Sequence, residues 1–293
     1  MRIGARGSDL AQRQARMIES RLNLEGIETE MIIISTHGDR VLDVPLNQLG
    51  AQGVFTKEIE DALIAGRIDL AVHSFKDVAT VQPGGLEIVA ITEREDCADL
   101  LLIRPEMSFD EDAFIPVKPD STVGTSAVRR SIQLQALRPD LRLKDLRGNV
   151  PTRLDRLHNR EYDAIFLAAA GVNRLGLDLS GLNVVRLDPA RFVPSPGQGA
   201  LAIEMRCGDP LVSRIRKCLH HEATATATVI ERGLLKLFGG GCSLPLGVWA
   251  TPNPDGWSVS AFWGDTSMPQ WANRTGSNID EIINELFQNF QVR

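Results

Sequence analysis

Short apolar runs typical of β-strands alternate with stretches of helical periodicity over the first two-thirds of this sequence. Ser8 suits the N-cap of a helix through Leu24, in which Met17, Ile18 and Leu22 share one face. Strands are expected near residues 1–5, 32–34, 70–73 and 88–91. This alternation predicts an α/β fold with largely parallel sheets and right-handed crossover connections.

The same alternation resumes beyond residue 96 and predicts a second α/β unit. Residues 123–124 favour a strand, and Ser126 is expected to cap the helix that carries Arg129 and Arg130. Another strand is expected near 163–167, followed by a short helix with Arg174.

The last third of the chain has a different pattern. A long helix is expected over 220–238, followed by antiparallel strands over 246–250 and 257–263. An amphipathic helix with apolar positions from Ile279 to Phe290 ends the chain. These elements predict a small α+β domain.

Several polar side chains follow expected strands directly. Ligands of α/β sheets bind at the carboxyl ends of the strands. The residues placed there are Arg6, Ser74, Lys76, Asp77, Thr125, Ser126 and Arg147. Their shared placement is the strongest indication of a site in the first two units.

Arginines are frequent beside these loops. A guanidinium group binds carboxylates or phosphates through a planar fork, so several in one cleft would suit a polyanionic small molecule. The alternative is that they are solvated surface residues. Because Arg129 and Arg130 are adjacent on a helix, one is expected to face a ligand and the other to be structural.

Asp77 beside Lys76 can offset a developing cation or move a proton, although a lone aspartate after a strand is also a common turn or cap residue. The pair His220-His221 is interpreted as structural, because adjacent histidines point to different sides of a helix. No metal site is expected.

Cys242 follows three glycines and precedes Pro245, which predicts a tight loop with room beside the backbone and an accessible thiol. An incidental buried cysteine is the alternative. The other cysteines form no C-x-x-C pair, which favours free thiols and a reducing cytoplasm.

Charge and hydropathy exclude two classes of partner. The formal net charge of −6 argues against a general nucleic-acid interface. The longest apolar stretch, 164–172, is far shorter than the ~20 residues that span a bilayer, and the N-terminus lacks a signal-peptide pattern. A cytoplasmic location is expected.

Six short motifs in colinear order resemble porphobilinogen deaminase, also called hydroxymethylbilane synthase. They are Arg6-Gly7-Ser8, His73-Ser74-Phe75-Lys76-Asp77-Val78, Gly124-Thr125-Ser126-Ala127-Val128-Arg129-Arg130, Leu146-Arg147-Gly148-Asn149-Val150, Pro196-Gly197-Gln198-Gly199-Ala200 and Gly240-Gly241-Cys242. Each motif is weak alone, but six in order are specific.

The resemblance implies a defined activity. The family joins four porphobilinogen molecules head to tail, releases ammonia at each step and frees the linear tetrapyrrole by hydrolysis. Its dipyrromethane cofactor would be attached to Cys242 through a thioether, which fits a thiolate nucleophile.

The resemblance also implies roles for particular residues. Asp77, Lys76 and Arg6 would be catalytic. Cofactor and substrate would be bound by Ser8, Phe55, Ser74, Thr125, Ser126, Arg129, Arg130, Arg147, Asn149, Arg153, Arg174 and Gln198. Gln48 and Gln52 stand where family members commonly have lysines, which predicts weaker carboxylate contacts there.

The fold implied by the resemblance has two periplasmic-binding-protein-like α/β domains and a small C-terminal α+β domain. Residues 1–94 and 197–217 would form domain 1, residues 95–196 domain 2, and residues 218–293 domain 3. Hinge flexing would let the cleft take a lengthening product.

Two other functions use part of the same pattern. A two-lobed anion-binding protein would share the fold and the arginines but would give Cys242 no task. A cysteine-nucleophile acyl transferase or hydrolase would need an oriented histidine such as His73, His220 or His221. A chromophore attached to Cys242 would exclude both.

Overall fold

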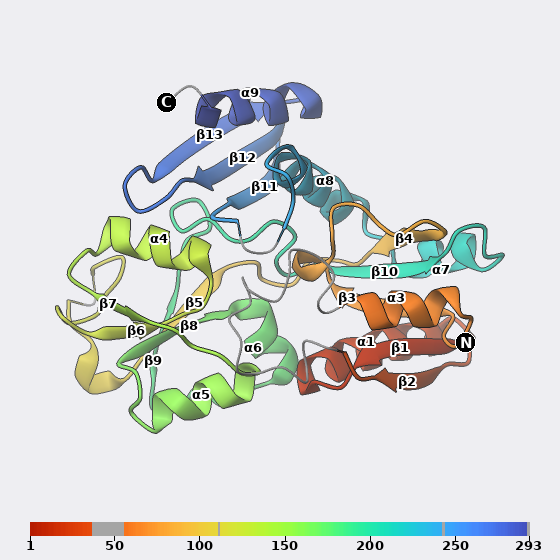
Figure 1. Ribbon diagram of the computed structural model, residues 1–293, viewed down its shortest axis with the longest axis horizontal. Coiled ribbons are helices and arrows are strands. Elements are labelled where there is room, and N and C mark those ends of the chain that lie inside the picture. Colours follow the sequence, from red (N-terminus) through yellow and green to blue (C-terminus); the bar gives the residue numbers. More distant parts are fainter. Residues whose placement is uncertain (37–55, 111, 242–243, 292–293) are drawn as a thin grey trace. The chain divides into compact units, whose positions relative to one another are not determined.

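The computed structural model describes residues 1–36, 56–110, 112–241 and 244–291 (Figure 1). Contacts divide the described chain into two compact units. Unit 1 comprises the described residues of Met1–Glu95 and Gly197–Cys242, and unit 2 those of Asp96–Pro196 and Ser243–Arg293. None of the helices within these ranges is both long and apolar enough to cross a membrane.

Unit 1 contains a five-stranded sheet in the order β2-β1-β3-β10-β4. The strands are β1 (Arg2–Arg6), β2 (Glu30–Ile34), β3 (Leu70–Ser74), β4 (Leu86–Ile91) and β10 (Leu201–Arg206). β1 is parallel to β2 and β3, whereas β10 is antiparallel to β3 and β4. The reversed β10 was not expected from the sequence.

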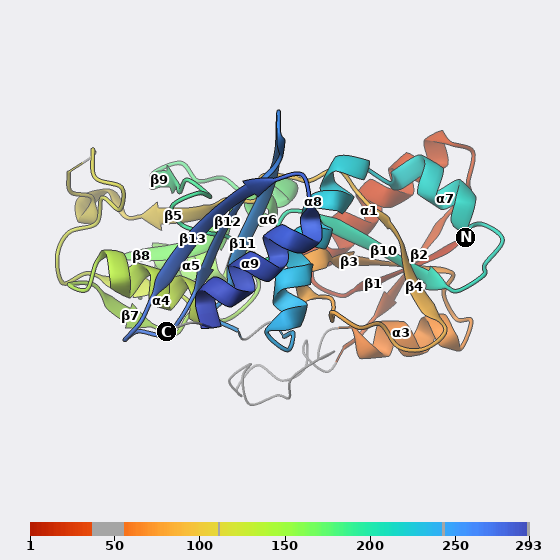
Figure 2. The ribbon, with the colours of Figure 1, turned by 90° about the horizontal axis from the view of Figure 1, so that it is seen from above.

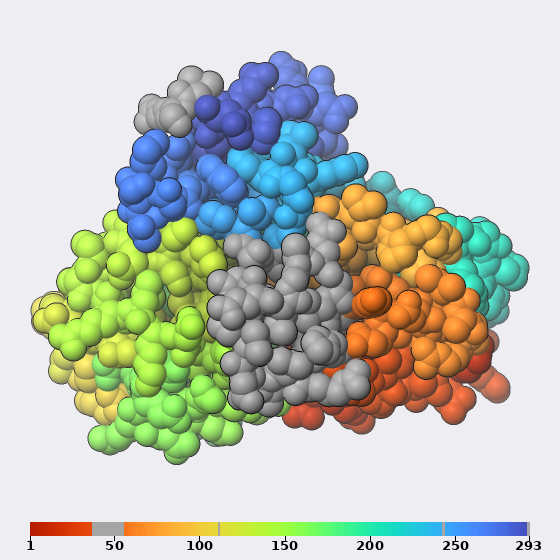
Figure 3. Space-filling view, in the orientation of Figure 1, coloured from red at the N-terminus to blue at the C-terminus, as the bar shows by residue number. Residues whose placement is uncertain are grey.

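Helices cover both faces of this sheet. They are α1 (Asp9–Leu24), α3 (Lys57–Ile64), α7 (Val212–Leu219) and α8 (Glu222–Leu237). α1 and α7 share one apolar core with the sheet, which includes Ile18 and Ile215. α3 covers the opposite face through a second core with Ile59 and Leu63, and it appears in orange at the surface in Figure 3.

Unit 2 repeats this arrangement with different segments. Its sheet has the order β7-β6-β8-β5-β9. The elements are β5 (Asp99–Ile103), β6 (Thr122–Gly124), β7 (Arg142–Lys144), β8 (Ala164–Ala168), β9 (Asn183–Arg186), α4 (Val128–Leu137), α5 (Val150–His158) and α6 (Ala169–Leu175). β6 is parallel to β7 and β8, and β5 is the reversed strand. The expected α/β class is therefore confirmed, with one reversed strand in each sheet.

The reversed strands have a consequence for the sites. β10 runs against β3, so Leu201 pairs with Ser74 at the carboxyl end of β3. β5 runs against β8, so Asp99 pairs with Ala168 at the carboxyl end of β8. Each reversed strand therefore begins at the edge where its parallel neighbours end, which is the edge that binds ligands in such sheets.

A second, three-stranded antiparallel sheet belongs to unit 2. It consists of β11 (Gly247–Asn253), β12 (Gly256–Trp263) and β13 (Gln270–Gly276), and α9 (Ile279–Gln291) packs on β12 and β13 (Figure 2). The first two strands and the final helix match the sequence-based expectation. β13 was not predicted.

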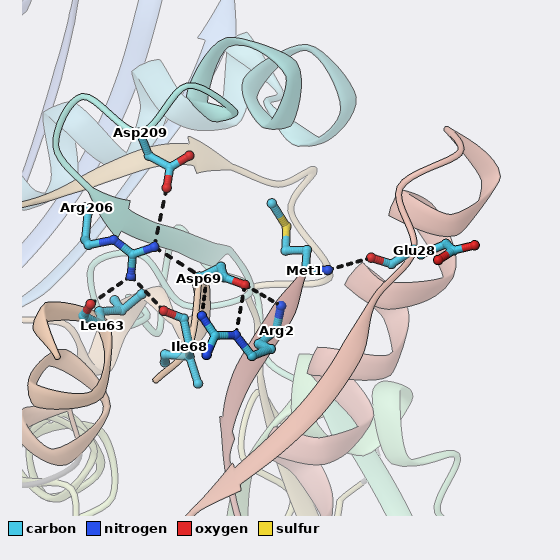
Figure 4. A network of polar contacts seen from close by, with 8 residues as sticks. All are labelled: Met1, Arg2, Glu28, Leu63, Ile68, Asp69, Arg206 and Asp209. Carbon is cyan, nitrogen blue, oxygen red and sulfur yellow. Dashed lines mark hydrogen bonds and ion pairs between the residues drawn. The ribbon is translucent and has the colours of Figure 1, made fainter. Parts of the chain in front are cut away.

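A network of hydrogen bonds and ion pairs lies at the amino-terminal edge of the unit 1 sheet (Figure 4). The Arg2 guanidinium donates to both oxygens of Asp69, at 2.7 and 3.2 Å, and the Arg2 backbone N–H donates to Oδ2. Arg206 donates to the carbonyl oxygens of Leu63 and Ile68 at 2.8 and 2.7 Å. The hydrogen bonds from Arg2 lower the pKa of Asp69 to about 2.

This pKa predicts a stability effect with a defined pH range. Because the folded-state pKa lies below the unfolded value of about 4, the ionised carboxylate stabilises the fold above pH 4, and this stabilisation is lost as the pH falls toward 2. Asp69→Asn is expected to lower the free energy of unfolding at pH 7 by about 1–2 kcal/mol. Urea titrations followed by circular dichroism should show the difference narrowing below pH 4; a difference that is constant with pH would contradict it.

Candidate functional site

The carboxyl edge of the unit 1 sheet contains a small cavity of about 80 Å³. Arg6 is the last residue of β1, and Ser74 is the last residue of the neighbouring parallel strand β3. Both strands therefore deliver side chains to the same edge. The polar residues that line the cavity are Arg6, Ser8, Gln14, Thr56, His73, Ser74 and Asp77.

Local hydrogen bonds fix the floor of this cavity. Ser8 accepts a hydrogen bond from the Ala11 backbone N–H and so forms the N-cap of α1, as the sequence predicted. Ser74 and Gln14 exchange hydrogen bonds of 2.9 and 3.2 Å. The N-terminal end of α1 is thereby tied to the end of β3.

Asp77 lies in a single turn of 3-10 helix, Phe75–Asp77, that continues directly from β3. Arg232 of α8 donates to the carbonyl oxygens of Phe75, Val78 and Ala79, at 3.1, 3.0 and 2.6 Å. Its guanidinium group also lies 4.2 Å from the centre of the Phe75 ring. α8 therefore holds the turn that presents the half-buried Asp77 to the cavity.

The loop 197–199 is the second segment held by α8. Buried Glu231 accepts from the Gly197 backbone N–H at 2.7 Å and forms an ion pair with Arg94 at 2.6 Å. Gln198 is almost fully buried, and its Oε1 accepts from Lys76 Nζ at 3.3 Å. Two residues of the expected site, Lys76 and Gln198, are thus brought into contact.

Gly199 is predicted to be intolerant of a side chain. Its φ is +91°, which favours glycine, and a Cβ would overlap the carbonyl oxygen of Glu95. Gly199→Ala is expected to cost about 1–3 kcal/mol of unfolding free energy. Thermal unfolding measures this, with Gly66→Ala as control: φ there is +66° but nothing lies within 4 Å. Equal losses in both variants would mean that the contact with Glu95 does not matter.

The carboxyl edge of the unit 2 sheet gathers a second polar set. Thr125 and Ser126 follow β6, and Thr125 is almost fully buried. Arg147 follows β7, and the Asn149 side chain caps α5 by accepting from the Thr152 N–H at 2.9 Å. The expected placement of these residues at strand ends is confirmed.

One local expectation for this set is wrong. Ser126 is not the N-cap of α4; Ala127 holds that position, and the Ser126 hydroxyl donates instead to the Leu146 carbonyl oxygen at 2.6 Å. The sequence prediction failed because a nearby carbonyl oxygen competes for the hydroxyl. Arg153 is on α5, where its Nε donates to the Gly148 carbonyl oxygen at 2.8 Å.

Arg129 and Arg130 do not diverge as expected, because both bind one carboxylate. Arg129 donates to Asp99 Oδ2 at 2.8 Å, and Arg130 donates to Asp99 Oδ1 at 2.7 Å. The long side chains reach around the first turn of α4 to the start of β5, and the expectation that one of them faces a ligand stays a prediction. Burial alone would raise the pKa of Asp99, but the two cations hold it well below its usual range.

The remaining predicted site residues are placed as follows. Arg174 is buried at the last turn of α6, a turn and a half beyond the end of β8. Phe55, Cys242, Gln48 and Gln52 lie outside the described residues. His221 accepts from the Thr224 N–H as the N-cap of α8, and His220 accepts from the Ile91 N–H, which supports the structural interpretation of both.

The buried acids that organise these edges were not predicted from the sequence. Asp99 precedes the apolar run Leu100–Ile103, and Glu204 interrupts the apolar strand β10. Glu231 lies on the buried face of α8. In each case, a charged residue within a segment with apolar periodicity was the available signal, since such residues are rarely buried without a partner.

Comparisons with known proteins agree on one family. Residues 1–214 match the family model described as "Porphobilinogen deaminase, dipyromethane cofactor binding domain". A porphobilinogen deaminase of Syntrophobacter fumaroxidans is 45% identical over 249 residues, which are 84% of this chain and 78% of that protein. One from Maridesulfovibrio salexigens is 44% identical over 278 residues, 94% of this chain and 88% of that protein.

Solved structures with a similar arrangement include two solute-binding proteins. An ancestral cationic amino acid solute binding protein is 13% identical, covers 74% of this chain and 86% of its own, and has a TM-score of 0.45. A periplasmic substrate-binding protein of an ABC transporter from Coxiella burnetii is 15% identical, covers 82% and 98%, and has a TM-score of 0.45.

Proposed function

This chain belongs to the porphobilinogen deaminase family, and from that membership we propose which of its residues carry the family's reaction. Its function is that of a hydroxymethylbilane synthase, a transferase of tetrapyrrole synthesis. Four porphobilinogen molecules are joined head to tail with loss of ammonia, and the linear product is released by hydrolysis. The observation that carries this conclusion is the family match over residues 1–214.

The residues that lead to Cys242 fit a covalently held dipyrromethane. Gly239, Gly240 and Gly241 have φ values of +89°, +70° and +117°, and nothing lies within 4 Å of a Cβ built on Gly239. A backbone without side chains therefore precedes the thiol, so a flat ring can approach it. When bound through the Cys242 sulfur, the dipyrromethane supplies the pyrrole carbon from which the chain grows.

Asp77 is proposed as the catalytic carboxylate. It projects from a turn that Arg232 and β3 hold in place, into a cavity that also contains Arg6. Loss of ammonia leaves positive charge on the substrate pyrrole, and a fixed carboxylate in a partly buried site offsets that charge without reorganisation. The same oxygens can accept hydrogen bonds from pyrrole N–H groups.

Cationic and hydroxyl side chains at the two sheet edges are proposed to bind carboxylates. Each pyrrole unit carries an acetate and a propionate group, so the growing chain gains negative charge at every step. In unit 1 these ligands would be Arg6, Lys76, Ser8 and Ser74, with Gln198 orienting Lys76. In unit 2 they would be Thr125, Ser126, Arg129, Arg130, Arg147, Asn149, Arg153 and Arg174. The aromatic ring of Phe55 would stack on the incoming pyrrole ring.

We also propose that the chain acts as a cytoplasmic monomer of three domains, with boundaries at 1–94 with 197–217, 95–196 and 218–293. The matching order of the two five-stranded sheets and the separate antiparallel sheet β11–β13 support this division. Domain 3 would include α8, whose Glu231 and Arg232 bind residues of the first sheet's loops.

Intact mass of the purified protein tests the function. The parent chain is expected to exceed its sequence mass by two linked pyrrole units, and Cys242→Ser is expected to show the bare mass. If the parent has the bare mass, incubation with porphobilinogen decides: an enzyme lacking its cofactor gains the two units. A binding protein or an acyl transferase gains nothing, which would overturn the proposal.

A further inference from the structure

Three titratable side chains with no role in the proposed mechanism lie together in unit 1, between α3 and the sheet. His73 of β3 and Glu204 of β10 are diagonal neighbours, because the register sets Glu204 opposite Ala71 and Ala202 opposite His73. His73 Nε2 lies 3.0 Å from Glu204 Oε2, and both side chains are buried. Glu60 is on the buried face of α3, which packs over these strands.

These three residues form the His73 cluster. It contains two carboxyl groups and one imidazole, and burial opposes ionisation of both carboxyl groups at once. Within the described part of the chain, Glu204 Oε1 is buried and no hydrogen-bond partner reaches it. Burial raises the pKa of Glu60, and the charge of Glu204 acts in the same direction. Two ionised carboxylates buried beside one imidazole would leave an uncompensated charge, which is costly in the protein interior.

The geometry also connects the cluster to the active cavity. His73 and Asp77 line the same cavity, and Asp77 is only four residues further along the chain. The register of β10 against β4 shifts between Ile203 and Glu204, and such irregularities commonly re-aim a side chain beside an active site. The charged groups around His73 are Arg6 from β1, Asp77 from the turn after β3, Glu60 from α3 and Glu204 from β10, whereas α1 contributes the uncharged Ser8 and Gln14.

We propose that His73, Glu204 and Glu60 are positioning residues that hold exchangeable protons. As the pH changes, these protons set the charge on the side of the cavity that His73 lines, beside Asp77. This inference rests on the proposed function of Asp77. When the His73 cluster is protonated, its positive charge destabilises the cationic intermediate on the substrate. When the cluster has lost the proton, that intermediate is stabilised. The cluster therefore produces an acid limb in the pH profile, which is a fall in kcat/KM as the pH is lowered.

Two variants and one control test the proposal by steady-state kinetics of the cofactor-loaded enzyme. Glu204→Gln removes the counter-charge of the imidazolium, so the acid limb is expected to move to lower pH by about one unit. His73→Gln is expected to remove the limb. Ile203→Val, on the same strand but facing the α1 core, should weaken the fold and leave the limb in place.

A second readout separates this inference from the function itself. The chain has five histidines, so the ¹⁵N signals of the His73 ring can be assigned from their loss in His73→Gln. Their titration is expected to move in Glu204→Gln, and to a smaller extent in Glu60→Gln, whether or not the protein forms hydroxymethylbilane. An unmoved titration, or an acid limb that is the same in the parent, Glu204→Gln and His73→Gln, would overturn the proposal. An inactive parent with a shifted titration would instead contradict the proposed function.

Discussion

Asp77→Asn is expected to lower kcat by about 10²–10³-fold, which is typical for loss of one preorganised group that stabilises transition-state charge. Asparagine keeps the shape of the side chain and removes only the negative charge, which is proposed to offset the cationic pyrrole. KM is expected to change little, because the substrate carboxylates are proposed to be bound by cationic groups such as Arg6 and Lys76. Ammonia release under steady-state conditions measures both constants.

Two further variants show whether the effect belongs to Asp77. Lys76→Gln is expected to raise KM more than it lowers kcat, since it removes the ammonium group that is proposed to bind a substrate carboxylate. That group donates to Gln198 Oε1 at 3.3 Å. Glu25→Gln removes an exposed acid of unit 1 at the C-cap of α1 and should leave both constants unchanged. A kcat for Asp77→Asn within threefold of the parent would exclude Asp77 as the charge-stabilising group.

The sequence predicted those helices and strands whose local residue pattern agrees with the structure they adopt. β8 is a continuous apolar run and β3 begins with one, Leu70–Val72, as expected for strands covered on both faces. α1 has its N-cap and the buried Ile18 and Leu22 as predicted, whereas Met17 is exposed. β10 was missed because Glu204 interrupts its apolar run. β7 has only three residues, so its pairing with β6 rather than a local pattern makes it a strand.

Local sequence patterns also predicted part of the candidate site, namely the residues at the ends of strands. Residues that follow parallel strands, such as Arg6 and Thr125, could be placed at sheet edges from local patterns alone. The partners of Arg129 and Arg130 could not, because Asp99 is 30 residues away in sequence and reaches them only through the reversed β5. The sheet order decides such contacts, and no local pattern encodes it.

Asp99→Asn is expected to lower the free energy of unfolding of unit 2 by about 3–5 kcal/mol, because it leaves two buried guanidinium groups without their shared counter-charge. The side chains of Arg129 and Arg130 are 6% and 7% exposed, so water cannot replace the lost carboxylate. The measurement is urea unfolding at pH 7 followed by tryptophan fluorescence. All four tryptophans lie in β11, β12 and β13, so this signal reports on unit 2.

A matched carboxylate and a double variant complete this test. Asp96→Asn breaks an ion pair of similar geometry to Arg186, but the Arg186 side chain is 54% exposed, so the expected loss is no more than about 1 kcal/mol. Adding Arg130→Met to Asp99→Asn removes one of the two cations and should recover part of the lost stability, since burial of a lone charge is the main cost. Equal losses for Asp96→Asn and Asp99→Asn, or no recovery in the double variant, would mean that Asp99 is not what holds Arg129 and Arg130 beside the carboxyl edge of unit 2.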